Sequence, residues 1–219
     1  MEGMNKQILF AIKKNDVERV LQVAVMPGCD VNFVSARKLT PLLYACKQGG
    51  VSTLLIEKLV AYGADIEYKD KEEKTPFFHA CAKGSRELIR TLVRVGCNKN
   101  KPNIHGDRPI HEAVIHGNLE ALLELLDQGV SINEGNRITG HTPLHLAVLH
   151  EQTDVVDLLL QKGAPPDKRG NNYILNGPLL IMFDCIFERF TYYYSYIGGR
   201  DCPTLCRTDI IASYYQTTG

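Results

Sequence analysis

Two residue types recur along this chain at nearly constant spacing, and this recurrence limits the fold more than any other feature. Four prolines are separated by 35, 33 and 34 residues: Pro41, Pro76, Pro109 and Pro143. Five glycines keep the same phase: Gly28, Gly63, Gly96, Gly129 and Gly163. Proline is favoured at the first position of a helix, and glycine is favoured just after its last turn. The spacing therefore predicts a row of similar helical units.

Residues 142–163 show what one unit contains. Thr142 is a favourable N-cap, Pro143 follows it, and the apolar residues of 144–148 form one helix face. After a short break, the apolar run 155–160 predicts a second helix, which ends at Gly163. Two short helices cannot bury both apolar faces alone, so such a unit requires copies of itself.

The segments around the four prolines carry a family signature. They read T-P-L-L-Y-A at 40–45, T-P-F-F-H-A at 75–80, R-P-I-H-E-A at 108–113 and T-P-L-H-L-A at 142–147. This pattern resembles the ankyrin repeat, whose signature is T-P-L-H-x-A with a period of about 33 residues. The resemblance covers residues 5–168 and implies an all-α ankyrin-repeat solenoid of about five helix-turn-helix units with β-turn or hairpin connections. The expected units are 5–34, 35–68, 69–101, 102–134 and 135–168.

Some residues depart from the family pattern. Lys38 and Glu73 stand where the resemblance predicts a glycine in the leading turn, whereas Gly106 and Gly140 keep it. This leaves the geometry of the first two turns open. Arg108 replaces the capping threonine, which is expected to weaken that helix start by up to about 1 kcal/mol.

The first two units also differ from the others. The first unit has no T-P-L-H segment; we expect a helix over 7–14, a second helix opened by Asp16, and a capping role for this unit. The second unit holds two additional residues near 50–53, which predicts a longer turn between its helices.

The repeat register is lost after Gly170. A sixth unit would place T-P-L-H near 172–176, where the chain reads N-Y-I-L-N. Residues 171–219 also hold seven of the ten tyrosines. We interpret this segment as an irregular tail, either a degenerate cap on the last unit or a variant carboxyl terminus.

Composition narrows the class of partner and compartment. The 25 Lys and Arg residues balance the 25 Asp and Glu residues, so neither nucleic acid nor a membrane surface is expected as the partner. The first residues are too charged for a signal peptide, and no apolar run is long enough to span a membrane. Cys29, Cys46, Cys81 and Cys97 occupy small packed positions, which suits a reducing compartment. We expect an intracellular monomer, in the cytoplasm, the nucleus or both.

Catalytic motifs are missing from the sequence. It contains no phosphate-binding loop, nucleophile elbow or H-E-x-x-H segment, so we expect no enzyme, no cofactor and no metal. Cys202 and Cys206 lack the second pair of ligands that a zinc site needs. His111 and His145 occupy the structural histidine position of the resemblance, and His79 lies one place further along. These three are predicted to tie the leading turns to the helices.

The resemblance implies a concave partner-binding surface, formed by the ends of the first helices and the leading turns. On this sequence the surface is basic in units two and three and apolar in units four and five. Its expected residues are Lys47, Lys71, Lys74, Lys83, Ile104, Ile115, His116, Ile138, His141, Leu149 and His150. The alternatives are that some apolar side chains pack against the turns and that the histidines are only solvated. We predict a non-enzymatic module, a scaffold or adaptor, that binds another protein.

A second function stays open. D-R-P-I-H-E-A at 107–113 is similar to units of ankyrin proteins that carry a carboxyl-terminal SOCS box, and T-L-C-R at 204–207 weakly resembles that box. Such a protein would be a substrate receptor of a ubiquitin ligase. However, the leucine expected four residues before Cys206 is Cys202. Co-purification with elongin would distinguish the two functions.

Overall fold

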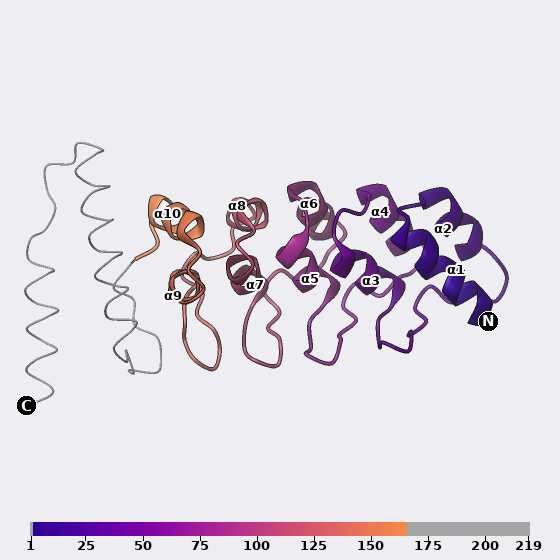
Figure 1. Cartoon of the computed structure of the whole chain (residues 1–219), viewed down its shortest axis with the longest axis horizontal. Helices are drawn as coiled ribbons and strands as arrows, with labels where there is room; N and C mark the ends of the chain where they lie inside the picture. Colours follow the sequence, from indigo (N-terminus) through magenta and orange to yellow (C-terminus); the bar gives the residue numbers. More distant parts are fainter. Residues whose placement is uncertain (1, 166–219) are drawn as a thin grey trace, which may run out of the picture. The chain divides into compact units, whose positions relative to one another are not determined.

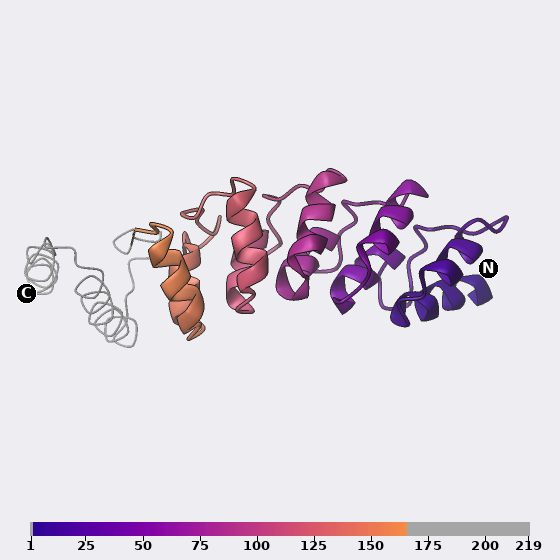
Figure 2. The ribbon, with the colours of Figure 1, turned by 90° about the horizontal axis from the view of Figure 1, so that it is seen from above.

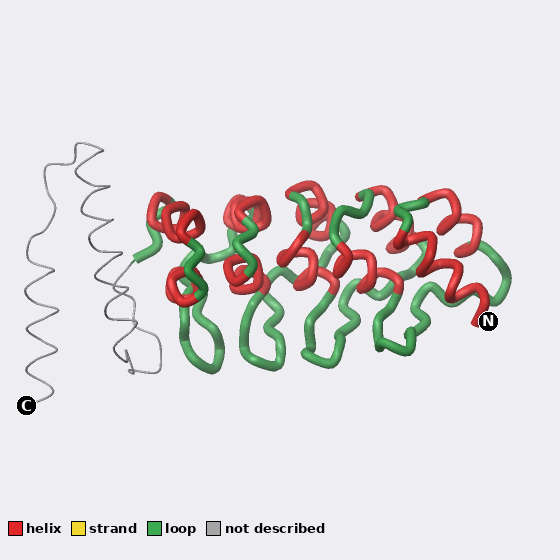
Figure 3. The backbone as a smooth tube through the Cα atoms, in the orientation of Figure 1, coloured by secondary structure: helices red, strands yellow, loops and turns green. Residues whose placement is uncertain are grey.

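The computed structural model describes residues 2–165 of the 219-residue chain, and within this range it contains ten helices and no strand. The predicted tail, 171–219, and the SOCS-like segment lie outside the described residues. The helices form five consecutive pairs, and a leading turn precedes each pair from the second onward (Figures 1 and 3). The pairs are α1 (Glu2–Lys13) and α2 (Val17–Ala24), α3 (Pro41–Gln48) and α4 (Thr53–Ala61), α5 (Pro76–Lys83) and α6 (Arg86–Arg94), α7 (Pro109–Ile115) and α8 (Leu119–Asp127), α9 (Pro143–Leu149) and α10 (Thr153–Gln161).

The helix pairs lie side by side, and their tilt changes steadily from the first pair to the last (Figure 2). Each first helix contacts the first helix of the next pair, and the apolar core lies between the helices. Phe77 and Phe78 of α5 are fully buried, and so are Leu88 and Ile89 of α6, at 0–1% exposure. Burial of this continuous core is what makes the short helices stable, because each pair covers the apolar face of its neighbour.

The prolines and threonines begin the first helices as predicted. All four prolines are the first residues of their helices, α3, α5, α7 and α9. Three threonine hydroxyls accept a hydrogen bond from the N–H three residues later: Thr40 at 3.3 Å, Thr75 at 3.4 Å and Thr142 at 3.5 Å. Each bond satisfies a donor that has no partner inside the helix.

The start of α7 uses a different cap. Arg108 has no side-chain acceptor, because a guanidinium only donates hydrogen bonds. The His111 N–H instead donates to the Arg108 carbonyl at 2.9 Å. Nδ1 of His111 also accepts from the Arg108 N–H at 3.0 Å, as Nδ1 of His145 does from the Thr142 N–H in α9. The histidine therefore supports the helix start from within the first turn.

The leading turns keep one backbone feature despite their different residues. Lys38 and Glu73 have φ of 57° and 58°, in the same left-handed region as Gly106 at 78° and Gly140 at 71°. The substitutions therefore leave this feature of the turn in place. A residue with a Cβ atom is strained there, at a cost of order 1 kcal/mol.

Two expectations for the first units have different outcomes. The longer turn of the second unit is confirmed, because residues 49–52 separate α3 from α4 whereas only 84–85 separate α5 from α6. The predicted start of the first helix at residue 7 is wrong, because α1 begins at Glu2. Residues 3–7 are exposed or half-buried, so no apolar period marks where this helix starts.

Candidate protein-binding surface

The predicted binding residues come from two repeated places in the fold. Lys47, Lys83, Ile115 and Leu149 lie in the last two residues of α3, α5, α7 and α9. The others lie in the leading turns or directly after a first helix: Lys71, Lys74, Ile104, His116, Ile138, His141 and His150. The turns project together on one side of the row of helices (Figure 3). We call the surface made by these turns and helix ends the turn face.

Units four and five supply the apolar part of the turn face. Ile104, Ile138 and Leu149 are 55%, 63% and 50% exposed, whereas Ile115 is half-buried. Ile104 and Ile138 lie on successive leading turns, and exposed apolar side chains that gather on a surface mark interaction sites. These three side chains are therefore largely open to solvent.

The turns that carry the isoleucines are linked by hydrogen bonds between units. The Ile104 N–H donates to the carbonyl of Glu72 at 3.0 Å, and the Arg137 N–H donates to the carbonyl of Gly106 at 2.9 Å. The amide of Asn136 donates to the carbonyl of His105 at 3.0 Å. These bonds hold neighbouring turns in a fixed relation, so the apolar part is preorganised.

Units two and three supply the basic part. Lys47, Lys71 and Lys83 are exposed. Lys74 differs, because its side chain is only 17% exposed and its Nζ lies 3.2 Å from Oε1 of Glu112 and 3.0 Å from Oε2 of Glu72. Burial opposes the charge of Lys74, but the two carboxylates outweigh it and raise the pKa of Lys74. The free positive charge of this surface therefore comes from the other three lysines.

Glu112 is a member of this surface that the sequence did not reveal. It lies on α7, is 5% exposed, and pairs with Lys74 of the preceding unit. Nδ1 of His116 also lies 3.8 Å from its Oε1. The only signal was an acidic residue at the variable position of R-P-I-H-E-A. Its carboxylate therefore lies between Lys74 of unit three and His116 of unit four.

The prediction that three histidines tie turns to helices is confirmed. Nε2 of His79 lies 2.8 Å from Oδ2 of Asp70 in its own turn. His111 is fully buried, and its Nε2 donates to the carbonyl of Glu134 at 2.7 Å while Nδ1 accepts from Arg108. Nδ1 of His145 lies 2.7 Å from the Thr142 hydroxyl. Burial lowers the pKa of both His79 and His111, although their partners oppose it.

The remaining histidines are more accessible. His116 and His150 are exposed, at the ends of α7 and α9, and His141 is half-buried with its ring stacked on His145 at 5.8 Å. Within residues 2–165, no group of three His, Cys, Asp or Glu side chains is arranged to hold a metal ion.

The cysteines of units one to three are free thiols. Cys46, Cys81 and Cys97 are buried and Cys29 is half-buried, and none of the four forms a disulfide. Burial, aided by Glu67, raises the pKa of Cys97 to about 12, so this thiol stays protonated and unreactive. Among the described helices, none is long and apolar enough to cross a membrane.

Comparison with known families agrees with the helix pairs and turns. A family model described as ankyrin repeats in three copies matches residues 8–103, 51–136 and 96–170. A search of curated proteins gave no match. The family matches together cover residues 8–170, which is well over half of the chain. Ankyrin repeats generally mediate protein–protein interaction and are typically not enzymes. This chain therefore belongs to the ankyrin repeat family.

Proposed function

We propose that this protein is a non-enzymatic module that binds a partner protein on the turn face. The observation that carries the proposal is the exposure of Ile104, Ile138 and Leu149 on neighbouring turns and α9. Protein interfaces typically have an apolar centre and a polar rim. Here the exposed lysines of units two and three supply a charged border.

The partner segment that fits this surface is apolar at one end and acidic at the other. Lys47, Lys71 and Lys83 attract carboxylates, whereas the isoleucines and Leu149 exclude water from aliphatic or aromatic side chains. Because hydrogen bonds link the turns of units three to five, little ordering is required on binding. This supports a role as an adaptor or scaffold.

The same proposal includes the oligomeric state and the cellular location of the protein. We propose a monomer in the cytoplasm or nucleus, where thiols remain reduced. The free, buried cysteines support this assignment.

The proposal is tested with a double variant, Ile138→Arg and Leu149→Arg, which replaces two exposed residues of the apolar part. Capture of partner proteins from cell extract is expected to be lost, while stability changes by less than about 0.5 kcal/mol because both sites are exposed. Leu54→Arg is the matched control, since Leu54 lies on α4 and is 48% exposed, close to the 50% of Leu149. Capture that is unchanged in the double variant would contradict the proposal.

A further inference from the structure

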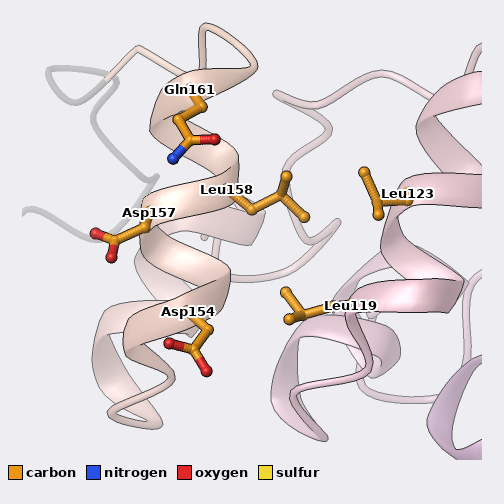
Figure 4. Close-up of a pocket in the computed structure, with 6 residues that line it drawn as sticks. All are labelled: Leu119, Leu123, Asp154, Asp157, Leu158 and Gln161. Atoms are coloured by element: carbon orange, nitrogen blue, oxygen red, sulfur yellow. The ribbon is translucent and has the colours of Figure 1, made fainter. Parts of the chain in front are cut away.

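A shallow groove lies between α8 and α10, on second helices rather than on the turn face (Figure 4). Its volume is about 240 Å³. Leu119 and Leu123 of α8 point across it toward Leu158 of α10 (Figure 4). Asp154, Asp157 and Gln161 complete the lining from α10. An apolar cavity of roughly 150 Å³ accepts a benzene-sized group, so the groove has room for one or two aliphatic side chains.

The preceding pair of second helices shows why this groove is unusual. Between α6 and α8, the equivalent positions carry charges that bridge the two helices. Arg86 Nε lies 2.8 Å from Glu124 Oε2, and Arg90 Nη2 lies 2.9 Å from the same oxygen. Arg86 also pairs with Asp127. These side chains cover the space between α6 and α8.

One unit later, each of these charges is replaced. Leu119 and Leu123 stand 33 residues after Arg86 and Arg90, and Leu158 stands 34 residues after Glu124. Within the described residues, α8 and α10 also pack less closely than the other neighbouring second helices. The bridging ion pairs are thus replaced by half-buried leucines that leave an open groove.

The charged residues of the two helices that border the groove are all acidic. Neither α8 nor α10 contains a lysine or arginine. The carboxylates of Asp154 and Asp157 form no hydrogen bond or ion pair with another side chain of residues 2–165. The carboxylates on the α10 side are therefore available to a cation.

We propose that this groove binds a segment of a partner protein that presents two aliphatic side chains flanked by lysine or arginine. The leucines would exclude water from the aliphatic side chains, and Asp154 and Asp157 would pair with the flanking cations. An amphipathic helix with leucines at i and i+4 has this geometry. The site lies apart from the turn face, so it does not depend on the function proposed above.

The test is a methyl NMR titration of the full chain with a synthetic helical peptide that carries leucines at i and i+4 between flanking lysines. The methyl groups of Leu119, Leu123 and Leu158 are expected to shift. A control peptide with serine for both leucines should not bind. A second control with glutamate for the lysines should bind about tenfold more weakly at low salt, because two surface ion pairs become repulsive.

Two variants of the protein sharpen the test. The first is a triple variant, Leu119→Arg, Leu123→Arg and Leu158→Glu. It places the charges found between α6 and α8 at the equivalent positions of α8 and α10. It should fold, because the same set closes the space between α6 and α8, and it should lose at least about tenfold in peptide affinity. The second, Asp154→Asn with Asp157→Asn, alters only exposed residues. It should weaken binding about threefold to fivefold and remove most of its salt dependence.

Several outcomes would overturn the proposal. One is the absence of any shift in the three leucine methyl groups, and another is equal binding of the serine or glutamate peptide. Unchanged affinity of the first variant would do the same. Shifts confined to Ile104, Ile138 and Leu149 would assign the peptide to the turn face. Groove methyl shifts that depend on protein concentration would assign the groove to a second copy, and contacts with residues 166–219 would assign it to the chain itself.

Discussion

The third and fourth units share a backbone plan but differ in chemistry at equivalent places. In the leading turn, Glu73 and Gly106 both have positive φ, but only the first carries a side chain. The first helix of each of these two units holds a buried histidine. In unit three, His79 contacts Asp70 in the turn of its own unit. In unit four, His111 contacts the carbonyl of Glu134 in the turn of the next unit. The histidine of unit three therefore secures one unit, whereas the histidine of unit four joins two units.

The second helices of these units differ even more. Arg86 and Arg90 of α6 reach the carboxylate of Glu124, whereas Leu119 and Leu123 of α8 border a groove. The repeat fixes where each side chain is placed, and packing requires apolar residues only at the positions that form the core. Surface positions are therefore free to carry different chemistry in each unit, which is how an array of similar units acquires distinct binding surfaces.

The largest expected effect comes from the histidines. His111→Ala should destabilise the protein by about 3 kcal/mol, because it leaves a cavity in place of a fully buried ring and removes the partner of the Glu134 carbonyl and of the Arg108 N–H. His79→Ala should cost about 1–2 kcal/mol, because Asp70 still accepts the N–H groups of Glu72 and Lys74 in its turn. Urea denaturation measures both. Equal losses would remove the distinction between a histidine that joins units and one that does not.

The histidine of unit four also predicts a pH dependence. Burial lowers the pKa of His111 below its ordinary value of 6.5 in spite of the bond to Glu134. Its contribution to stability is therefore complete above about pH 6.5 and is lost as the pH falls further. His111→Ala should reduce this part of the pH dependence, as measured by unfolding between pH 7 and pH 5.

The turns give the next largest effect, with opposite signs in the two units. A Cβ atom on Gly106 would lie 2.9 Å from Oδ1 of Asn136 and 3.0 Å from the backbone nitrogen of Ile138. Gly106→Ala should therefore cost about 2 kcal/mol. Glu73→Gly should raise stability by about 0.5 kcal/mol, because it removes a residue strained by its positive φ. Thermal unfolding measures both; a loss of stability in Glu73→Gly would show that its side chain matters more than the strain.

A smaller loss of stability than for Gly106→Ala is expected at the carboxylate between α6 and α8. Burial opposes ionisation of Glu124, but hydrogen bonds from Arg86, Arg90 and Gln128 outweigh it and lower its pKa to about 2. Because this is below the ordinary value of 4.5, its stabilisation is present above about pH 4.5 and is lost as the pH falls toward 2.

Glu124→Gln should cost about 1 kcal/mol at neutral pH, since both arginines are more than a third exposed and remain solvated. The difference between the variant and the natural protein should shrink as the pH falls from 4.5 to 2. A constant difference over that range would mean that Glu124 acts through packing rather than through charge.

The sequence was a good guide wherever structure depends on local signals. Pro76 marks a helix start because its ring fixes φ, whereas Gly96 marks a helix end because glycine adopts a positive φ, here 98°, at little cost. The exposed positions of Ile104 and Ile138 follow from the register of the repeat. The start of α1 was predicted too late, because exposed polar residues carry no period.

Contacts between side chains of different units could not be predicted from the sequence. Lys74 and Glu112 are 38 residues apart, and their pairing depends on the lateral offset of neighbouring units. The groove beside Leu158 depends in the same way on the separation of α8 and α10. Repeat spacing tells which residues are equivalent, but it does not give the distance between side chains of successive units.

The hydrogen bonds between successive leading turns also have a mechanical consequence. The backbone bonds from Ile104 to Glu72 and from Arg137 to Gly106 run from one unit to the next. A force applied to the turn of unit five is transmitted through these bonds to the turn of unit three. These three units should therefore extend and relax together. A partner held on the turn face of units four and five would thus load unit three as well.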